Sequence, residues 1–384
     1  MKRTYQLPYL FGIGIFTLCF LVFTHPSFAQ KIRSLKKPVV KKELIGQIDG
    51  RDVFEFTLDN ASGMEVRVMT YGATITDIVT PDREGERMSV VLGLDSLSHY
   101  AGWQNSLMGS TVGRVAGRIE NGRFSLDGKE YVLTSDIHGG QNGFDKRHWI
   151  GEATRLGASP AVEMTYISKD GEEGYPGNLT VKITFSLNKD NELLIDYKAT
   201  TDKATPLVLT NHSYFNLSGG KSKDALNTEL TVFADRYLEY GDGSMPTGTI
   251  GEVKGTPFDF THVKTIGEDI DKVQQYTAGY DVTFALRNQS GKLQLAARAF
   301  EPLSGREMEV YTTEPGMVFY SGNYLSEKVA GRNGVPYTKN GAFCLETQHY
   351  PNSVHNPSFP NTILRPGEKF HSQTIYKFGV RKRE

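Results

Sequence analysis

After Leu44, much of the chain alternates between hydrophobic and polar positions with a period of two residues. The clearest stretch is residues 181–187, which read Val-Lys-Ile-Thr-Phe-Ser-Leu without a break in the alternation. Successive side chains of a β-strand point to opposite faces, so this period is typical of a strand with one buried face. Shorter stretches with the same period include Val66 and Val68, and Leu293, Leu295 and Ala297. The pattern therefore predicts a chain built mainly from half-buried strands.

Turn residues separate these alternating stretches. Asn121-Gly122 and Asp127-Gly128 are dipeptides that favour tight turns, and both lie between short apolar segments within residues 118–133. Long amphipathic helical patterns are absent from the sequence, and one short helix is predicted over residues 267–276. After Leu44, neither a change of composition nor a fixed-period repeat divides the sequence into separate domains. We therefore predict an all-β protein with one large antiparallel domain, residues 44–384.

The first 29 residues differ from the rest of the sequence. Lys2 and Arg3 are followed by an apolar stretch over residues 10–23, and then by Ser27-Phe28-Ala29, which has small residues where an export peptidase cleaves. An uncleaved membrane anchor is the alternative, but the apolar stretch is shorter than the roughly 20 residues of a membrane span. We expect a signal peptide that is cleaved before Gln30, and a protein that is periplasmic or secreted.

Residues 30–43 are basic and poor in large apolar side chains, which predicts a flexible lead before the domain. The whole chain has 384 residues, 38% hydrophobic and 23% charged, as in ordinary globular proteins. Its 43 Lys and Arg nearly balance its 44 Asp and Glu, for a formal net charge of -1. Such a balance gives no general attraction to nucleic acid or to anionic membranes, so we expect neither as a partner.

Several common chemistries lack their sequence patterns here. The two cysteines are Cys19 and Cys344, and cleavage of the leader would leave Cys344 without an intramolecular disulfide partner. We find no Gly-x-Ser-x-Gly nucleophile turn, no His-Glu-x-x-His or paired Cys-x-x-Cys metal pattern, and no complete P-loop. These absences favour a mechanism without cofactor or metal that uses histidine, carboxylates and arginine.

One polar and aromatic cluster follows the apolar residues 207–209. It reads Thr-Asn-His-Ser-Tyr-Phe-Asn-Leu over residues 210–217, with His212 near its start. Histidine can exchange a proton near neutral pH because its unperturbed pKa is about 6.5. A structural histidine in a polar turn is the commoner situation for such a residue, and spacing alone favours it.

Four further residues are candidates, each with an ordinary structural alternative. Glu346 follows an apolar strand segment, where burial would raise its pKa towards that of a useful base, or it lies at a strand edge in solvent. His138 precedes two glycines that allow close approach of a ligand, or it is exposed in a glycine turn. Asp281 binds hydroxyls or caps a turn, and Arg118 binds a ligand or lies on the surface.

Taken in order, these segments resemble the aldose 1-epimerase (galactose mutarotase) family. The matching segments are residues 113–133, 138–140, 174–177, 210–217, 279–281, 311–324 and 343–368. They extend over nearly everything after residue 45, and the Asn-His-Ser-Tyr-Phe-Asn-Leu and Leu-Glu-Thr-Gln-His stretches are each specific. The resemblance implies the family's fold, a large antiparallel β-sandwich.

The resemblance also implies the roles of the site residues. Glu346 would be the general base and His212 the general acid, while Arg118 and His138 would bind sugar oxygens and Asp281 sugar hydroxyls. The implied activity is that of an isomerase that interconverts the α- and β-anomers of free aldohexoses such as glucose and galactose. We expect a monomer that needs no cofactor. We also expect a carboxylate near His212 to raise its pKa, so that it holds a proton near neutral pH.

Two positions depart from the family's pattern. Gly117 stands where many relatives have Asn, so one side-chain donor to the sugar is missing. Glu314 stands where some relatives have Gln, and we expect its carboxylate to accept a hydrogen bond from a sugar hydroxyl. Two alternative functions stay open, a sugar-binding protein of the same fold without catalysis and a hexose-6-phosphate 1-epimerase.

Overall fold

A computed structural model describes residues 37–102, 105–287, 289–328 and 331–382. The expected signal peptide, residues 1–29, lies outside the described residues. The chain divides into two units, and the second unit, Lys36–Glu384, contains every element described below. In the described part of this unit, no helix is both long enough and apolar enough to cross a membrane.

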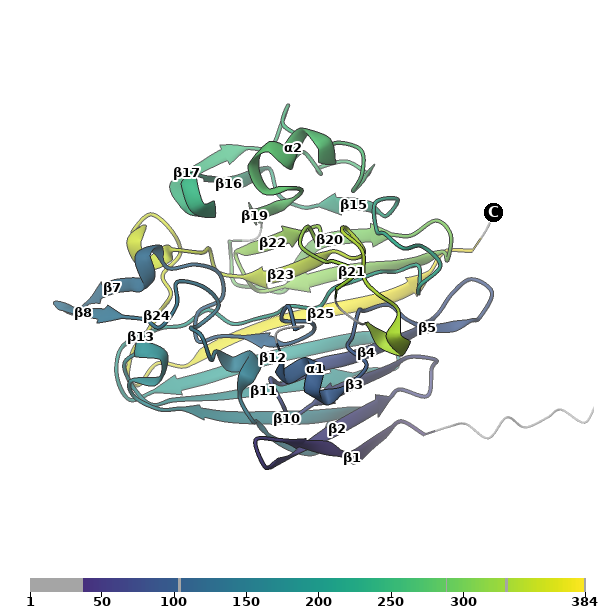
Figure 1. Cartoon of the computed structure of the whole chain (residues 1–384), viewed down its shortest axis with the longest axis horizontal. Helices are drawn as coiled ribbons and strands as arrows, with labels where there is room; N and C mark the ends of the chain where they lie inside the picture. The colour runs from purple at the N-terminus through teal and green to yellow at the C-terminus, as the bar shows by residue number, and fades with distance from the viewer. Residues whose placement is uncertain (1–36, 103–104, 288, 329–330, 383–384) are drawn as a thin grey trace, which may run out of the picture. The chain divides into compact units, whose positions relative to one another are not determined.

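One layer of the fold is a nine-stranded sheet. Its strands run in the order β18-β15-β20-β21-β25-β12-β11-β10-β9, and each neighbouring pair is antiparallel. Figure 1 shows the long strands β10, β11, β12 and β25 side by side. The bounds are β9 (Ile150–Leu156), β10 (Ser159–Ser168), β11 (Leu179–Leu187), β12 (Glu192–Thr201), β15 (Glu229–Val232), β18 (Lys264–Thr265), β20 (Gln294–Phe300), β21 (Arg306–Thr312) and β25 (Phe370–Val380).

Two five-stranded antiparallel sheets form the facing layer. The first sheet contains, in chain order, β1 (Val39–Ile48), β2 (Arg51–Asp59), β3 (Glu65–Met69), β4 (Thr74–Pro81) and β5 (Arg87–Ser89). The second sheet contains, in spatial order, β17 (Pro246–Glu252), β16 (Arg236–Tyr240), β19 (Asp281–Ala285), β22 (Gly316–Tyr320) and β23 (Cys344–Gln348). This second sheet carries much of the candidate site.

Short strand pairs, two short α-helices and six single-turn 3-10 helices complete the described elements. The strand pairs are β6 (Thr111–Val112) with β14 (Thr210–Asn211), β7 (Arg123–Leu126) with β8 (Lys129–Val132), and β13 (Thr205–Pro206) with β24 (Ile363–Leu364). The helices are α1 (Leu97–Ala101) and α2 (Ile270–Thr277). The predicted all-β fold is therefore confirmed, and the short helix expected over residues 267–276 is found as α2, which begins three residues later and ends one residue later.

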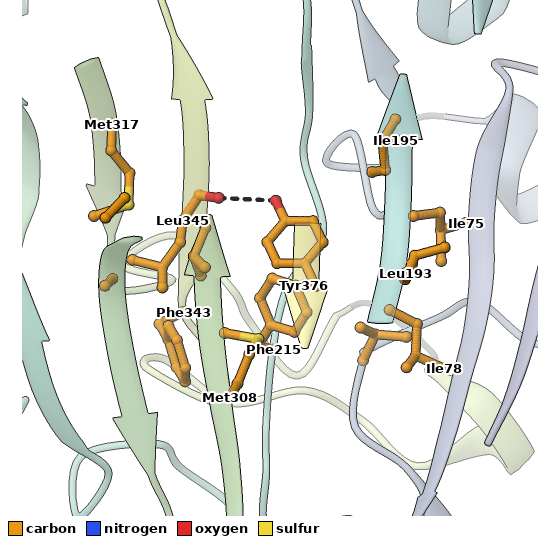
Figure 2. Packing of buried hydrophobic residues seen from close by; sticks show 14 of the residues in the cluster. Ile75, Ile78, Leu193, Ile195, Phe215, Met308, Met317, Phe343, Leu345 and Tyr376 are labelled. Carbon is orange, nitrogen blue, oxygen red and sulfur yellow. Dashed lines mark hydrogen bonds between the residues drawn. The ribbon is translucent and has the colours of Figure 1, made fainter. Parts of the chain in front are cut away.

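Apolar side chains of the two layers meet in one extensive core. Figure 2 shows Ile75 and Ile78 of β4 near Leu193 and Ile195 of β12, with all four side chains buried. In the same view Leu345 of β23 lies near Tyr376 of β25, whose hydroxyl donates to the Leu345 carbonyl at 3.0 Å. Burial of such side chains supplies the main driving force for folding. The core side of β23 is thus fixed by packing, which leaves its other face for the site.

The strand predictions are confirmed with two corrections. In β11, Val181, Ile183 and Phe185 are buried and Lys182 is exposed, as the alternation predicted. The stretch around Leu295 is less regular, because a bulge interrupts the pairing of β20 between Leu295 and Ala297 and shifts which face each residue occupies.

The expected start of the domain at residue 44 is wrong, because β1 begins at Val39. The last five residues of the predicted flexible lead pair with β2, from Val39 opposite Asp59 to Glu43 opposite Glu55. Lysine takes part in this strand because its aliphatic stem can cover apolar surface, and the Lys42 ammonium lies 4.2 Å from the centre of the Phe54 ring. The basic composition therefore concealed an edge strand, most of whose residues are exposed.

Candidate active site

Strand alternation builds one side of a cleft with a volume of about 340 Å³. In the second five-stranded sheet, Val318 of β22 lies opposite Glu346 of β23, and Tyr320 lies opposite both Asp281 of β19 and Cys344. Because residues two apart on a strand share a face, these five side chains come to one side of the sheet. Asp281, Val318, Tyr320 and Glu346 line the cleft.

A second side of the cleft is held in place by hydrogen bonds between segments that are distant in the sequence. The backbone of Phe215 pairs with that of Phe343 through two hydrogen bonds of 2.7 and 3.0 Å. The Thr210 hydroxyl donates to the Thr347 carbonyl at 3.0 Å. These contacts hold residues 210–215 along β23 and bring His212 to Glu346. The backbone of His212 is itself fixed, since its N–H donates to the Ser110 carbonyl at 2.9 Å.

The turn that carries His138 closes a third side of the cleft. The His138 N–H donates to the Gly117 carbonyl at 2.9 Å, and the Gly117 N–H donates to the Nδ1 atom of His138 at 3.3 Å. The turn needs glycine after the histidine, because a Cβ on Gly139 would lie 2.0 Å from the Gly113 carbonyl oxygen. His138 and Arg118 both line the cleft, together with Gly117.

Glu346 and His212 form the centre of the site. The Oε1 atom of Glu346 lies 3.6 Å from the Nε2 atom of His212, and the two residues are only 3% and 6% exposed. Burial raises the pKa of Glu346 well above its ordinary value, and the nearby charge of Asp281 raises it further. Burial lowers the pKa of His212 to about 4. Both directions disfavour charge, so burial favours the pair with Glu346 protonated and His212 neutral, and the two groups share one exchangeable proton.

The expectation that a carboxylate raises the pKa of His212 is therefore wrong. Glu346 does lie next to the imidazole, but the ring is almost fully buried, and the loss of hydration lowers the pKa of His212. A carboxylate does lie beside His212, as expected, but the sequence could not indicate how deeply the two side chains are buried.

The remaining predicted residues give the cleft donors and acceptors. Burial lowers the pKa of His138 to about 3, and the nearby charges of His212 and Arg118 add to this shift, so the ring is neutral. Its Nδ1 atom accepts from Gly117, which leaves Nε2–H as a donor. Burial raises the pKa of Asp281, partly offset by the charge of Arg118. Arg118 also pairs with Asp136 at 3.3 Å.

Glu314 lies outside this cleft, which corrects the expectation that it binds sugar. Its Oε2 atom is 2.5 Å from the Nδ1 atom of His349, and its side chain is only 3% exposed. This partner raises the pKa of His349 despite the opposing effect of burial. The Glu314 carboxylate therefore forms a structural ion pair with His349, the residue that directly follows β23.

Sequence reasoning missed several residues that line the cleft. They include Leu107, Tyr214, Tyr240, Val318, Tyr320, Tyr324 and Gln348. The two-residue period could have indicated Gln348, which follows Glu346 at the same spacing as the other members of that face. The tyrosines carried no comparable signal, because aromatic residues are as common in β cores as in ligand sites.

One group of side chains in the described part of the chain could hold a metal ion, and it is formed by His212, Cys344 and Glu346, whose ligand atoms lie within 4.8 Å of one another. Cys344 approaches the Nδ1 atom of the imidazole at 3.6 Å, whereas Glu346 approaches Nε2. The lone pairs of the two ring nitrogens diverge, so an ion bound to one nitrogen would lie away from the ligand at the other. The arrangement suits proton transfer better than chelation.

Comparisons with known proteins agree on one family. A family model described as "Aldose 1-epimerase" matches residues 55–377. Curated relatives include the galactose mutarotase of Rattus norvegicus, 40% identical over 89% of this chain and 99% of that protein, and the aldose 1-epimerase of Escherichia coli K12, 36% identical over 86% and 96%. The crystal structure of galactose 1-epimerase from Lactobacillus acidophilus NCFM is similar, with a TM-score of 0.78 at 29% identity, covering 90% of this chain and 99% of that one.

Proposed function

Because this chain belongs to the aldose 1-epimerase family, we propose that it is an isomerase that interconverts the α- and β-anomers of free aldohexoses, glucose and galactose among them. The observation that carries the proposal is the buried pair of His212 and Glu346 in the cleft, 3.6 Å apart and backed by Asp281. Ring opening needs a base at the C1 hydroxyl and an acid at the ring oxygen, and this pair supplies both.

In the opening step, Glu346 removes the proton from the C1 hydroxyl, and the C1 oxygen becomes a carbonyl as the bond from C1 to the ring oxygen breaks. The ring oxygen takes the proton of the Nε2 atom of His212. The products are an open-chain aldehyde, a protonated Glu346 and a neutral His212. This is the charge state that burial of the two groups favours.

The closing step runs the same transfers in reverse. After rotation about the C1–C2 bond, His212 takes back the proton of the C5 hydroxyl, whose oxygen attacks the other face of C1. Glu346 returns its proton to the C1 oxygen. Before opening, hydroxyl groups of the bound sugar that donate to Glu346 stabilise its carboxylate, which shifts the shared proton to His212. The cycle thus ends with both groups as they began.

The test is polarimetry on freshly dissolved α-anomers of glucose, galactose and glucose 6-phosphate, with and without a chelator. We expect acceleration with both free hexoses and unchanged rates with the chelator, because the proton transfers use side chains alone. Sugar binding without acceleration would instead favour a binding protein. Faster turnover of glucose 6-phosphate would favour a hexose-6-phosphate 1-epimerase.

We propose that Asp281, Arg118 and His138 hold the sugar, with the Asp281 carboxylate accepting from its hydroxyls. Replacing Asp281 by Asn keeps the shape of the side chain but removes the charge, and a hydrogen bond to a charged group contributes about 1.5–3 kcal/mol. We therefore expect Asp281→Asn to raise KM about 10- to 100-fold. Initial rates over a range of galactose concentrations measure this effect. An unchanged KM would remove Asp281 from the binding site.

We also propose that the protein is exported, on the evidence of the leader in its sequence. Lys2 and Arg3, the apolar residues 10–23 and the small residues around Ala29 together support cleavage before Gln30. N-terminal sequencing of the protein purified from the periplasm or medium should therefore begin at Gln30. Recovery of the uncleaved chain from the membrane fraction would support the anchor instead.

A further inference from the structure

The imidazole of His212 has a different partner at each nitrogen. Its Nε2 atom lies 3.6 Å from Glu346 Oε1, and its Nδ1 atom lies 3.6 Å from the Sγ atom of Cys344. Cys344 is fully buried and lies two residues before Glu346 on the same face of β23. The two partners of the ring are therefore held by a single strand. The proposed reaction uses Glu346 and leaves Cys344 without a role.

We propose that Cys344 is a positioning residue that accepts a hydrogen bond from Nδ1–H of His212, so that Nε2 is the nitrogen that exchanges protons with the sugar. The inference rests on the proposed function. An imidazole can carry its single neutral-state proton on either nitrogen, and the partner of one nitrogen decides which is free. With the proton kept at Nδ1, Nε2 can lose its own proton to the ring oxygen and later take it back.

Packing of the ring supports this assignment. The His212 ring stacks on Tyr214 with centroids 5.0 Å apart and an interplanar angle of 26°. The rings of Tyr320 and His138 meet it edge to face, at 6.4 and 5.8 Å. These aromatic contacts fix the plane of the imidazole but leave its protonation open. The titratable groups that face the ring are thus Glu346, Cys344, Tyr214, Tyr320 and His138.

The chemistry of the thiol suits a partner of this kind. Burial raises the pKa of Cys344 well above its ordinary value, so the group stays a neutral thiol. A neutral sulfur is a weak acceptor, so it can select a tautomer without adding charge. A carboxylate at the same place would stabilise the imidazolium and make His212 a weaker acid. Cys344 therefore orients the ring and leaves its proton easy to transfer.

His138 provides the contrast within the same cleft. There the Gly117 N–H, which can only donate, meets Nδ1 at 3.3 Å. Nδ1 of His138 must then be the acceptor, and its Nε2 atom carries the proton. The two histidines thus hold opposite tautomers, one as a fixed donor to the sugar and the other as a proton carrier.

Three substitutions of Cys344 test the role. Cys344→Val fills the space but removes the acceptor, and Cys344→Ala removes the acceptor and the volume. We expect kcat to fall about 5- to 10-fold in both, the effect of about one hydrogen bond, with KM unchanged. Cys344→Ser restores an acceptor and should recover most of kcat. A purely structural role would instead lower the melting temperature and leave kcat of the folded enzyme unchanged.

Nitrogen-15 NMR of the histidine side chains tests the tautomer without reference to turnover. The His212 signals are assigned by their loss in His212→Gln, and circular dichroism confirms that this variant is folded. We expect Nδ1 of His212 to be protonated in the neutral state of the wild type and to lose this preference in Cys344→Val. A neutral His212 with its proton on Nε2, or normal kcat in folded Cys344→Val, would overturn the inference. Absence of mutarotation in the wild type would instead reject the proposed function.

Discussion

Replacing Glu346 by Gln is expected to lower the rate of mutarotation by about 10²–10⁴-fold, the range typical of a lost general base. The amide has the size and shape of the carboxyl group, but it cannot take the proton of the C1 hydroxyl. Glu346 is buried, and among the residues that the structure describes its one ion pair is the contact with His212, so the neutral amide of the same shape should not unfold the chain. Polarimetry of fresh α-galactose, corrected for the spontaneous rate, measures the loss.

Glu314→Gln is the matched control for this substitution. It also replaces a buried carboxylate by an amide, and both carboxylates pair with a histidine, but Glu314 lies outside the cleft. We expect near-normal turnover in Glu314→Gln once circular dichroism shows that it is folded. Equal losses in the two variants would mean that a buried charge, not a base at position 346, sustains activity. Near-normal turnover in folded Glu346→Gln would reject the assignment of the base.

The sequence predicted the fold well because strand alternation is a local property. The alternation over residues 181–187 predicted that Val181, Ile183, Phe185 and Leu187 are buried, and the structure confirms this, although Ser186 is buried as well. The predicted domain start at Leu44 is too late because the lysines before it are also typical of a flexible, solvated segment. In β1 the ammonium group of Lys42 lies over the aromatic ring of Phe54.

The site was less predictable because it depends on contacts between distant segments. Nothing local in residues 210–217 indicates that Phe215 pairs with Phe343, yet this pairing brings His212 to Glu346. The family resemblance predicted which residues line the cleft but not how deeply they are buried. It therefore gave no indication that burial lowers the pKa of His212. It also placed Glu314 at the sugar, although His349 holds that carboxylate. How far a side chain is buried, and which partner it pairs with, can be read only from the three-dimensional structure.

Replacing His212 by Gln is expected to reduce turnover by a similar factor, about 10²–10⁴-fold, because the ring oxygen loses its proton donor. A glutamine side chain can still donate a hydrogen bond, so binding of the sugar should change less than kcat. Initial rates over a range of galactose concentrations separate the two effects. A loss confined to KM would make His212 a binding residue.

The double variant Glu346→Gln with His212→Gln decides whether the two residues act as one unit. Each opening of the ring needs both proton transfers, and the pair holds one proton between them, so removing either partner disables the other. The double variant should therefore have nearly the same rate of mutarotation as the less active of the two single variants, as for catalytic residues that act as a unit. Two losses that multiply would mean that Glu346 and His212 contribute independently, and the shared-proton mechanism would then be wrong.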